Sequence, residues 1–141
     1  MARMDDGFQT LIGFADNATV KLYEKGVQPP GIEGGGANET TTMRNTTWRT
    51  KSPKKLISLT DSELTVAYDA AVFPEIIAMI NENQLVTVTF EDGATLAFWG
   101  WIDSFEPDEI TEGEQPEASV TIIPSNQNDS GVETAPVYTA A

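Results

Sequence analysis

The sequence predicts a mainly β fold: an antiparallel β-sandwich or partial barrel with one packed α-helix and one long extended loop. Three observations predict it. Several short segments alternate apolar and polar residues with the period of two that half-buried strands show. One segment, residues 70–82, carries an apolar stripe at helical spacing, and residues 31–55 sustain neither period. With 141 residues, of which 40% are apolar, the chain is long enough for one domain with its own core.

Two strands are expected before the long loop. Residues 8–14 place Ile12 and Phe14 on one face of the first strand. A turn at Asp16-Asn17 then leads into a second alternating segment, residues 18–23.

The strands after the long loop follow one another closely. The expected segments are a strand from near Leu56 to Tyr68, then residues 85–91, 94–105 and 119–123. An acidic turn region with two prolines, residues 106–117, precedes the last strand. Because these segments are short and joined by turn residues, we expect mostly antiparallel pairing.

Asp92-Gly93 predicts a tight hairpin between the second and third of these segments, because both central positions of a type I′ turn need positive φ. The return strand places Leu96, Phe98 and Ile102 on one face, and Trp99, Trp101 and Asp103 on the other. Both faces carry bulky side chains, so we expect both to be at least partly covered.

The helix is expected over residues 70–82. Pro74 fits its first turn, where a missing N–H does no harm. The expected apolar stripe is Phe73, Ile76, Ile77 and Ile80, and Asn81 and Asn83 can end the helix. A helix this short is not stable alone in water, so it must dock on the sheet.

The long loop, residues 31–55, differs in kind from its surroundings. It contains Gly34-Gly35-Gly36 and many threonines, and its large apolar residues are Ile32, Met43 and Trp48. A segment of this size without regular structure is usually functional or disordered. We expect it to reach off a domain that spans residues 1–124, and to order on a partner. Residues 125–141, which show no period, are expected to form a mobile C-terminal tail.

Charge is divided unevenly along the chain. The net charge is −14, but residues 1–55 carry +2 and residues 56–141 carry −16, because all 8 Lys and Arg lie in the first part. Within the long loop, the basic residues form a block with no acid among them: Arg44, Arg49, Lys51, Lys54 and Lys55. Opposite charges on two parts of one chain favour head-to-tail contacts between copies, which build rings or filaments.

The composition excludes several classes of site. There is neither cysteine nor histidine, which removes thiolate metal sites, cysteine nucleophiles and the commonest general base. The Gly34–Gly36 run lacks the lysine of a phosphate-binding loop. No apolar run approaches the ~20 residues that span a bilayer. We therefore expect no enzyme, no catalytic residue, no metal, no cofactor and no membrane partner.

Two binding functions deserve comparison with self-assembly. Calcium would find oxygen ligands in an acidic cluster, but the EF-hand pattern is absent and a solvated loop explains the same residues. The cluster is Asp103, Glu106, Asp108, Glu109, Glu112 and Glu114. The basic block around Trp48 has the composition of a nucleic-acid interface, but the −16 of the remaining chain would repel phosphate. The alternative that stays open is a monomeric acidic β module for calcium or a basic partner.

Four stretches in order carry a family resemblance. They are residues 41–56, 85–93 and 96–106, followed by Glu112-Gly-Glu-Gln-Pro-Glu-Ala-Ser-Val-Thr-Ile-Ile-Pro124, the most specific of the four. Together they resemble the tail tube (major tail) proteins of long, non-contractile-tailed bacteriophages. The resemblance spans roughly residues 8–124 and leaves the tail unmatched.

The resemblance implies a structural virion protein. Members of the family form rings of six, whose sheets join into a continuous β-barrel around a lumen, and the rings stack into the tube that delivers the genome. It implies self-association, contacts with tape-measure, tail-tip and tail-terminator proteins, and passage of DNA without specific binding. It also implies assembly in the host cytoplasm and residence in the virion tail.

The resemblance and the charge distribution together suggest roles for particular residues. The long loop would reach the adjacent ring, which makes its cationic and aromatic residues the expected contacts: Arg44, Trp48, Arg49, Lys51, Lys54 and Lys55. A lumen lined by carboxylates would repel DNA phosphate, and the candidates for that lining are Glu91, Asp92 and Asp103. Strand register decides which acids face inward, because a slip of one residue reverses every side chain.

Overall fold

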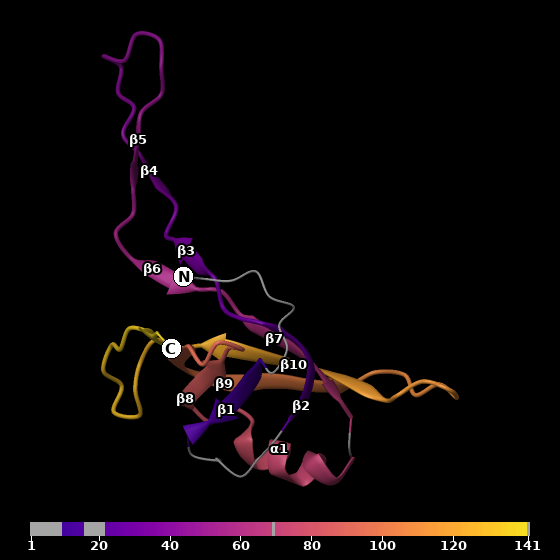
Figure 1. Ribbon diagram of the computed structural model, residues 1–141. Coiled ribbons are helices and arrows are strands. Elements are labelled where there is room, and N and C mark those ends of the chain that lie inside the picture. The colour runs from indigo at the N-terminus through magenta and orange to yellow at the C-terminus, as the bar shows by residue number, and fades with distance from the viewer. Residues whose placement is uncertain (1–9, 16–21, 69, 141) are drawn as a thin grey trace.

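A curved antiparallel sheet organises the protein (Figure 1). The computed structural model describes residues 10–15, 22–68 and 70–140. The main strands are β1 (Leu11–Phe14), β2 (Tyr23–Gln28), β7 (Ser62–Ala67), β8 (Gln84–Thr89), β9 (Thr95–Pro107), β10 (Glu117–Pro124) and β11 (Val137–Thr139). Their order is β1-β8-β9-β10-β7-β2, with β11 beside β9, and every pair is antiparallel. The predicted mainly β fold with one helix is confirmed.

The two ends of this strand order lie near each other. The backbone N–H of Ile12 on β1 donates to Glu24 Oε1 on β2 over 3.2 Å. A side chain therefore connects the first and last strands of the sheet. The predicted strand at residues 18–23 lies almost wholly outside the described residues, and β2 begins at Tyr23.

The core lies on one face of the sheet, as period-two patterning requires. Every second residue of β7, β8 and β10 is buried. The core side chains come from six strands and segments and include Phe14, Leu22, Leu64, Val66, Val86, Val88, Phe98, Ile102, Val120 and Ile122.

Strand β9 is the centre of the sheet and pairs on both sides. It pairs with β8 over Thr95–Gly100, and on its other side with β11 and then β10. A β-carbon at Gly100 would lie 2.6 Å from the carbonyl oxygen of Ile123, so only glycine fits this close approach. A bulge then places Asp103 outside the ladder, because Ile102 and Ser104 pair with consecutive residues of β10.

The helix is shorter than predicted and buries a different stripe. A 3₁₀ turn, η2 (Ala70–Val72), leads into α1 (Phe73–Met79). Ile76 and Met79 are buried against the sheet, but Phe73 is 44% exposed and Ile77 is 59% exposed. The prediction that Phe73 and Ile77 face the core is therefore wrong, because the i, i+3 pair of Ile76 and Met79 makes the contact. Asn81 has a φ of 63° and donates its N–H to Ile102 O over 3.1 Å, which ends the helix.

The β8–β9 turn also differs from its prediction. Phe90 O accepts from Gly93 N–H over 3.0 Å, and Phe90 N–H donates to Ala94 O over 2.9 Å. Of the two predicted turn residues, Gly93 has positive φ, and Asp92 does not. The loop is thus the three-residue kind closed by a left-handed glycine, and the type I′ prediction is wrong. Asp92 Oδ1 supports it by accepting from Ala94 N–H over 2.9 Å.

Residues 31–60, called the arm below, leave the sheet as a two-stranded ribbon (Figure 1). Near its base β3 (Ile32–Gly34) pairs with β6 (Ile57–Leu59), and farther out β4 (Ala37–Glu39) pairs with β5 (Lys51–Pro53). The long loop therefore contains regular structure that its sequence did not predict. Strands exposed on both faces need no apolar alternation, so no period-two signal marks them.

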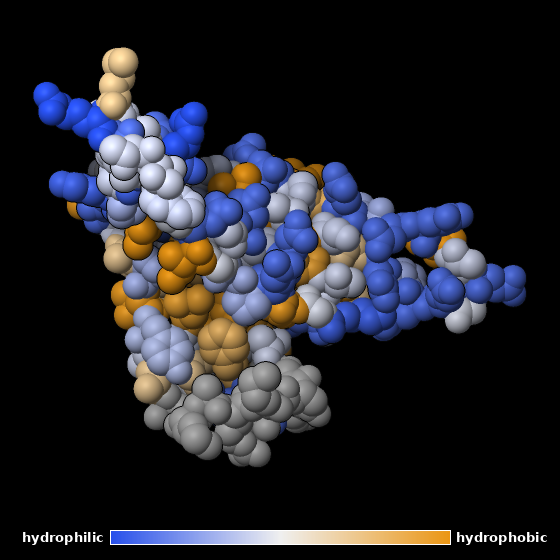
Figure 2. Space-filling model, turned by 90° about the horizontal axis from the view of Figure 1, so that it is seen from above, coloured by the Kyte–Doolittle hydropathy of each residue, from blue (hydrophilic) through white to orange (hydrophobic). Residues whose placement is uncertain are grey.

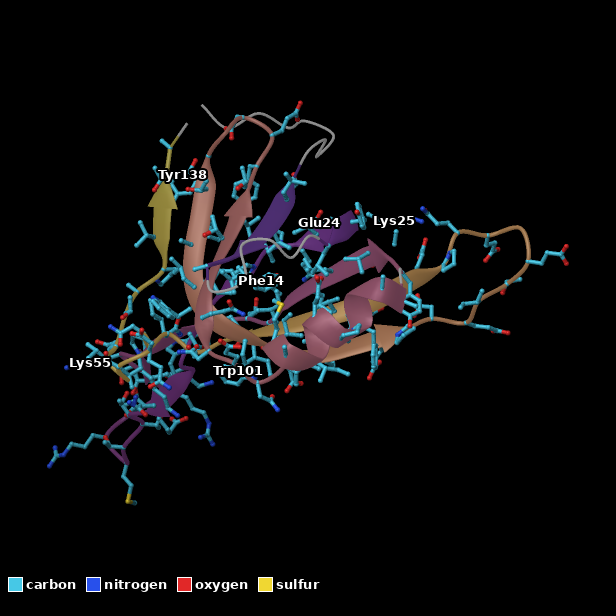
Figure 3. The ribbon with its side chains drawn as sticks, turned by 90° about the horizontal axis from the view of Figure 1, so that it is seen from below. Phe14, Glu24, Lys25, Lys55, Trp101 and Tyr138 are labelled. Carbon is cyan, nitrogen blue, oxygen red and sulfur yellow. The ribbon has the colours of Figure 1, made fainter. Side chains whose placement is uncertain are left out.

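The C-terminal segment follows a defined path as well. Gln127 and Glu133 form an isolated bridge, and β11 pairs with Thr95–Ala97 of β9. The label of Tyr138 in Figure 3 marks the position of β11 beside β9. Nothing in the residue pattern predicted β11, and the mobility of residues 125–141 stays a prediction.

Candidate assembly surfaces

Side-chain hydrogen bonds hold the outer end of the arm, residues 40–50, called the tip below. Thr40 N–H donates to Thr50 O over 2.9 Å, and Thr50 N–H donates to Thr41 Oγ1 over 2.8 Å. Asn45 Oδ1 accepts from Thr42 N–H over 2.9 Å. The bond to Thr41 Oγ1 shows one use of the threonine-rich composition, because a hydroxyl can satisfy a backbone N–H that has no sheet to pair with.

The tip presents its large side chains to solvent. Asn45 Nδ2 donates to Trp48 O over 2.9 Å, which fixes the backbone at Trp48. The Trp48 side chain is nevertheless 80% exposed, and Met43 at the turn is fully exposed. Exposed indole and thioether groups on a projecting element are typical of a contact surface, since isolated domains rarely leave such groups bare together.

All six residues predicted to contact another subunit lie on the arm and are exposed. Arg44, Trp48 and Arg49 belong to the tip, whereas the three lysines lie between the tip and the base. Lys54 is anchored through its backbone, whose N–H donates to Gly36 O over 3.0 Å. The label of Lys55 in Figure 3 marks its position on the arm. The structure gathers the six on one element, and their contact with a second copy stays a prediction.

At the base of the arm, its two chains are joined by the β3–β6 pairing and by hydrogen bonds between Gly31 and Thr60. Thr60 N–H donates to Gly31 O over 2.8 Å, and Gly31 N–H donates to Thr60 Oγ1 over 2.7 Å. Midway along, the two chains approach so closely that a β-carbon on Gly35 would lie 2.8 Å from Leu56 O. Glycine at this position lets the ribbon keep its direction.

A cavity of about 380 Å³ lies where the arm meets the C-terminal segment. We call it the arm-base cavity, and its lining residues are Ile32, Ile57, Ser58, Leu59, Asn126, Glu133, Thr134, Ala135 and Pro136. Sequence reasoning missed it, because the two segments that form it are about 70 residues apart in the chain. The one available signal was the presence of isoleucines at the start and end of a polar loop.

The three acids predicted for a lumen do not form one cluster. Glu91 and Asp92 lie in the β8–β9 turn, and Asp103 lies at the bulge of β9. An extended strand rises ~3.3 Å per residue, which separates that turn from the bulge by about 26 Å. All three are exposed, and which of them face a lumen stays a prediction.

The acidic hairpin end between β9 and β10 carries a second, polar hollow of about 440 Å³, lined by Asp108, Glu109, Glu114, Gln115 and Glu117. Glu117 on β10 forms an ion pair with Lys25 on β2. The pair spans β7, the strand that lies between them. Within residues 10–15, 22–68 and 70–140, no group of three or more carboxylates is placed to hold a metal ion. The calcium alternative therefore gains no support from this hairpin.

In the part of the chain that the structure describes, no helix has the length and apolar character needed to cross a membrane.

Comparisons with known proteins place this fold among tail assemblies. No protein-family model matches the sequence, and a comparison with curated protein sequences also finds no match. A chain from the virion of a native gene transfer agent particle superposes with a TM-score of 0.62 at 11% identity, covering 96% of this chain and 99% of that one. A chain from the tail of an empty gene transfer agent particle with C6 symmetry gives 0.61 at 10% identity, with the same coverage.

A third solved structure comes from a baseplate. A chain of the six-fold symmetrised baseplate of the anti-feeding prophage superposes with a TM-score of 0.65 at 6% identity, covering 99% of this chain and 98% of that one. The matches extend over nearly the whole of each chain, arm and tail included. This protein therefore has the fold of subunits found in phage-type tail and baseplate assemblies.

Proposed function

We propose that this protein is a structural subunit that assembles into hexameric rings, which stack into the tail tube through which a phage genome enters its host. The observation that carries the proposal is a projecting, cationic arm on a fold shared with subunits of six-fold tail assemblies. The proposal places the protein in the virion tail after assembly in the host cytoplasm. It gives the protein a structural role without catalysis.

Charge supports contacts between stacked copies. The arm carries Lys51, Lys54, Lys55 and the two arginines of its tip, and residues 56–141 carry −16. Attraction between an arm and the body of another copy is head-to-tail, so each copy can both give and receive an arm. Such contacts continue without limit along an axis, as a tube requires.

The edges of the sheet support contacts within a ring. Strand β11 has an outer edge and exposes Val137 and Tyr138. Strands β1 and β2 expose Leu11 and Tyr23, and they are joined by the Ile12–Glu24 hydrogen bond rather than by a strand ladder. Exposed edges with apolar and aromatic side chains promote aggregation unless another strand covers them. In a ring, the edge of each copy is covered by its neighbour, and the sheets then form one closed surface.

Electron microscopy of the purified protein tests the proposal. Concentrated protein should form tubes or six-fold rings in negative stain. A species that remains monomeric at high concentration, and gains thermal stability when calcium is added, would instead support the acidic binding module.

Charge reversal on the arm tests the electrostatic part. The quadruple variant is Arg49→Glu, Lys51→Glu, Lys54→Glu and Lys55→Glu. Because all four side chains are exposed, the variant should keep the unfolding temperature and lose tube formation. The matched control exchanges Lys for Arg and Arg for Lys at the same positions, and should assemble normally. Equal polymer yield from both variants would refute attraction through the arm.

A further inference from the structure

We propose that the arm-base cavity receives the tip of another copy's arm, with the Trp48 side chain entering the cavity and Arg49 beside Glu133. The inference rests on the proposed function and names the surface that the arm contacts. It commits to one occupant, a second copy of this chain.

The cavity walls are suited to an aromatic side chain. Ile32 and Ile57 at the base of the arm are 73% and 69% exposed, and the opposite wall contains Ala135 and Pro136. Figure 2, seen from above, shows hydrophobic residues exposed beside the hydrophilic arm. A volume of about 380 Å³ falls in the ~300–1,000 Å³ range of sites that enclose small molecules, so an indole fits without expansion.

One wall residue is incompletely satisfied in the isolated chain. Asn126 has a φ of 57°, and its backbone oxygen accepts from Thr134 N–H over 2.8 Å. Its side-chain Oδ1 is buried and has no hydrogen-bond partner among the described residues. A buried acceptor without a donor is unfavourable and rare. The indole N–H and the guanidinium of the tip are both donors, and rotation of the Asn126 side chain would bring its oxygen to an entering donor.

Charge agrees with this occupant. Glu133 is the single charged residue among the residues that line the cavity. The tip contains Arg44 and Arg49 and no acid. When Trp48 enters the cavity, its sequence neighbour Arg49 is left at the rim, where the Glu133 carboxylate can pair with it.

The shape of the molecule directs the tip away from its own cavity. Figure 1 shows the arm and the body extending to opposite sides of the arm base. If copies stack with their arms parallel, the tip of one copy points toward the next copy along the axis. The lysines of the arm then run beside the acidic body of that copy.

A charge swap tests the contact. Arg49→Glu and Glu133→Arg should each raise the critical concentration for tube formation about tenfold or more, because each variant brings two like charges together at the contact. The double variant should return it close to the wild-type value, because the pair is restored with its signs exchanged. Trp48→Ala should act like the single variants, and Trp48→Phe should act more weakly. Single variants that assemble as wild type, or a double variant that is worse than either, would overturn the inference.

Disulfide trapping tests the same contact without weakening it. The chain has no cysteine, so no native thiol competes with the pair Thr47→Cys and Ala135→Cys. Each single-cysteine variant serves as a control, because a bond between two like cysteines can give only a dimer. Oxidised tubes should yield a ladder of covalent oligomers in denaturing gels. The matched control joins Thr47→Cys to Ser119→Cys, an exposed position on β10, and should yield none. Equal cross-linking of the two pairs would refute the contact.

The two proposals fail in different ways. Wild-type tubes that tolerate the Trp48 and Glu133 substitutions and give no ladder would leave the tube function standing and remove this contact. Wild-type protein that forms neither tubes nor rings would remove both.

Discussion

Gly35 offers a test in which one methyl group changes the direction of the arm and leaves the core untouched. A β-carbon there would lie 2.8 Å from Leu56 O and 3.1 Å from the Cβ of Lys54, both on the opposite chain of the ribbon. Neither neighbour is the free end of a flexible side chain. Gly35→Ala must therefore push the two chains apart.

The displacement can be estimated from the geometry. Ordinary contact begins near 3.4 Å, so the Cβ–oxygen separation must increase by about 0.6 Å. Across a strand spacing of about 4.8 Å, this opening tilts the outer ribbon by about 7°. Met43 lies about 26 Å farther along at ~3.3 Å per residue, so the tip moves by about 3 Å. Interface contacts tolerate far less, because packing there matches protein interiors.

Two measurements can detect this displacement of the tip. Gly35→Ala should raise the critical concentration for tube formation, with no change in the unfolding temperature. Spin labels on Met43→Cys and Ser119→Cys should report an altered distance distribution in the unassembled protein. Gly34→Ala is the matched control, because a β-carbon at Gly34 meets nothing within 4 Å.

A Gly35→Ala protein that assembles like Gly34→Ala would refute the reasoning about the arm as an aligned contact element. An unchanged distance distribution would refute the geometric step. A lowered unfolding temperature would instead show that the arm is coupled to the core.

Three further predictions concern packing, backbone geometry and salt. Ile102→Ala should lower the free energy of unfolding in urea by about 2–5 kcal/mol, because Ile102 is fully buried on β9. Leu11→Ala, at a half-exposed position, should lower it by less than about 1 kcal/mol, and similar losses from both variants would contradict the described core. Asn81→Ala should lower the free energy of unfolding by about 1–2 kcal/mol and Asn81→Gly should not, because a φ of 63° suits glycine and not alanine. Equal Tm values for these two variants would contradict the left-handed helix end at Asn81. Raising the salt concentration from 0.1 to 1 M shortens the Debye length from about 10 to about 3 Å and should raise the critical concentration for assembly, whereas insensitivity to salt would exclude exposed ion pairs between copies.

The sequence predicted the elements whose residues alternate around a buried face. Val86 and Val88 on β8, or Leu64 and Val66 on β7, mark their strands because one side of each strand is in the core. For the same reason the helix was found and placed, and Asn81 correctly marked its end. Its stripe was misjudged, because seven residues make only about two turns and several rotations fit an apolar sequence equally well.

The arm and β11 could not be predicted in this way. Both are exposed on their two faces, so burial leaves no pattern on their residues. Their strands are held by backbone pairing and, in the tip, by threonine hydroxyls. The charge of the arm, its lack of a period and the family resemblance pointed to it as a contact element. The arm-base cavity needs the pairing of residues near 32 and 57 with residues near 133, which no local pattern encodes.

The hydrogen-bonded tip also bears on how quickly a polymer can grow. A loop that is already fixed gives up little conformational entropy when it binds, so docking does not wait for the chain to search for its shape. The rate of elongation is then set by the arrival of a correctly oriented copy, a diffusive step that electrostatic attraction accelerates. A fixed tip thus makes growth sensitive to viscosity and protein concentration, with little dependence on any slow folding event.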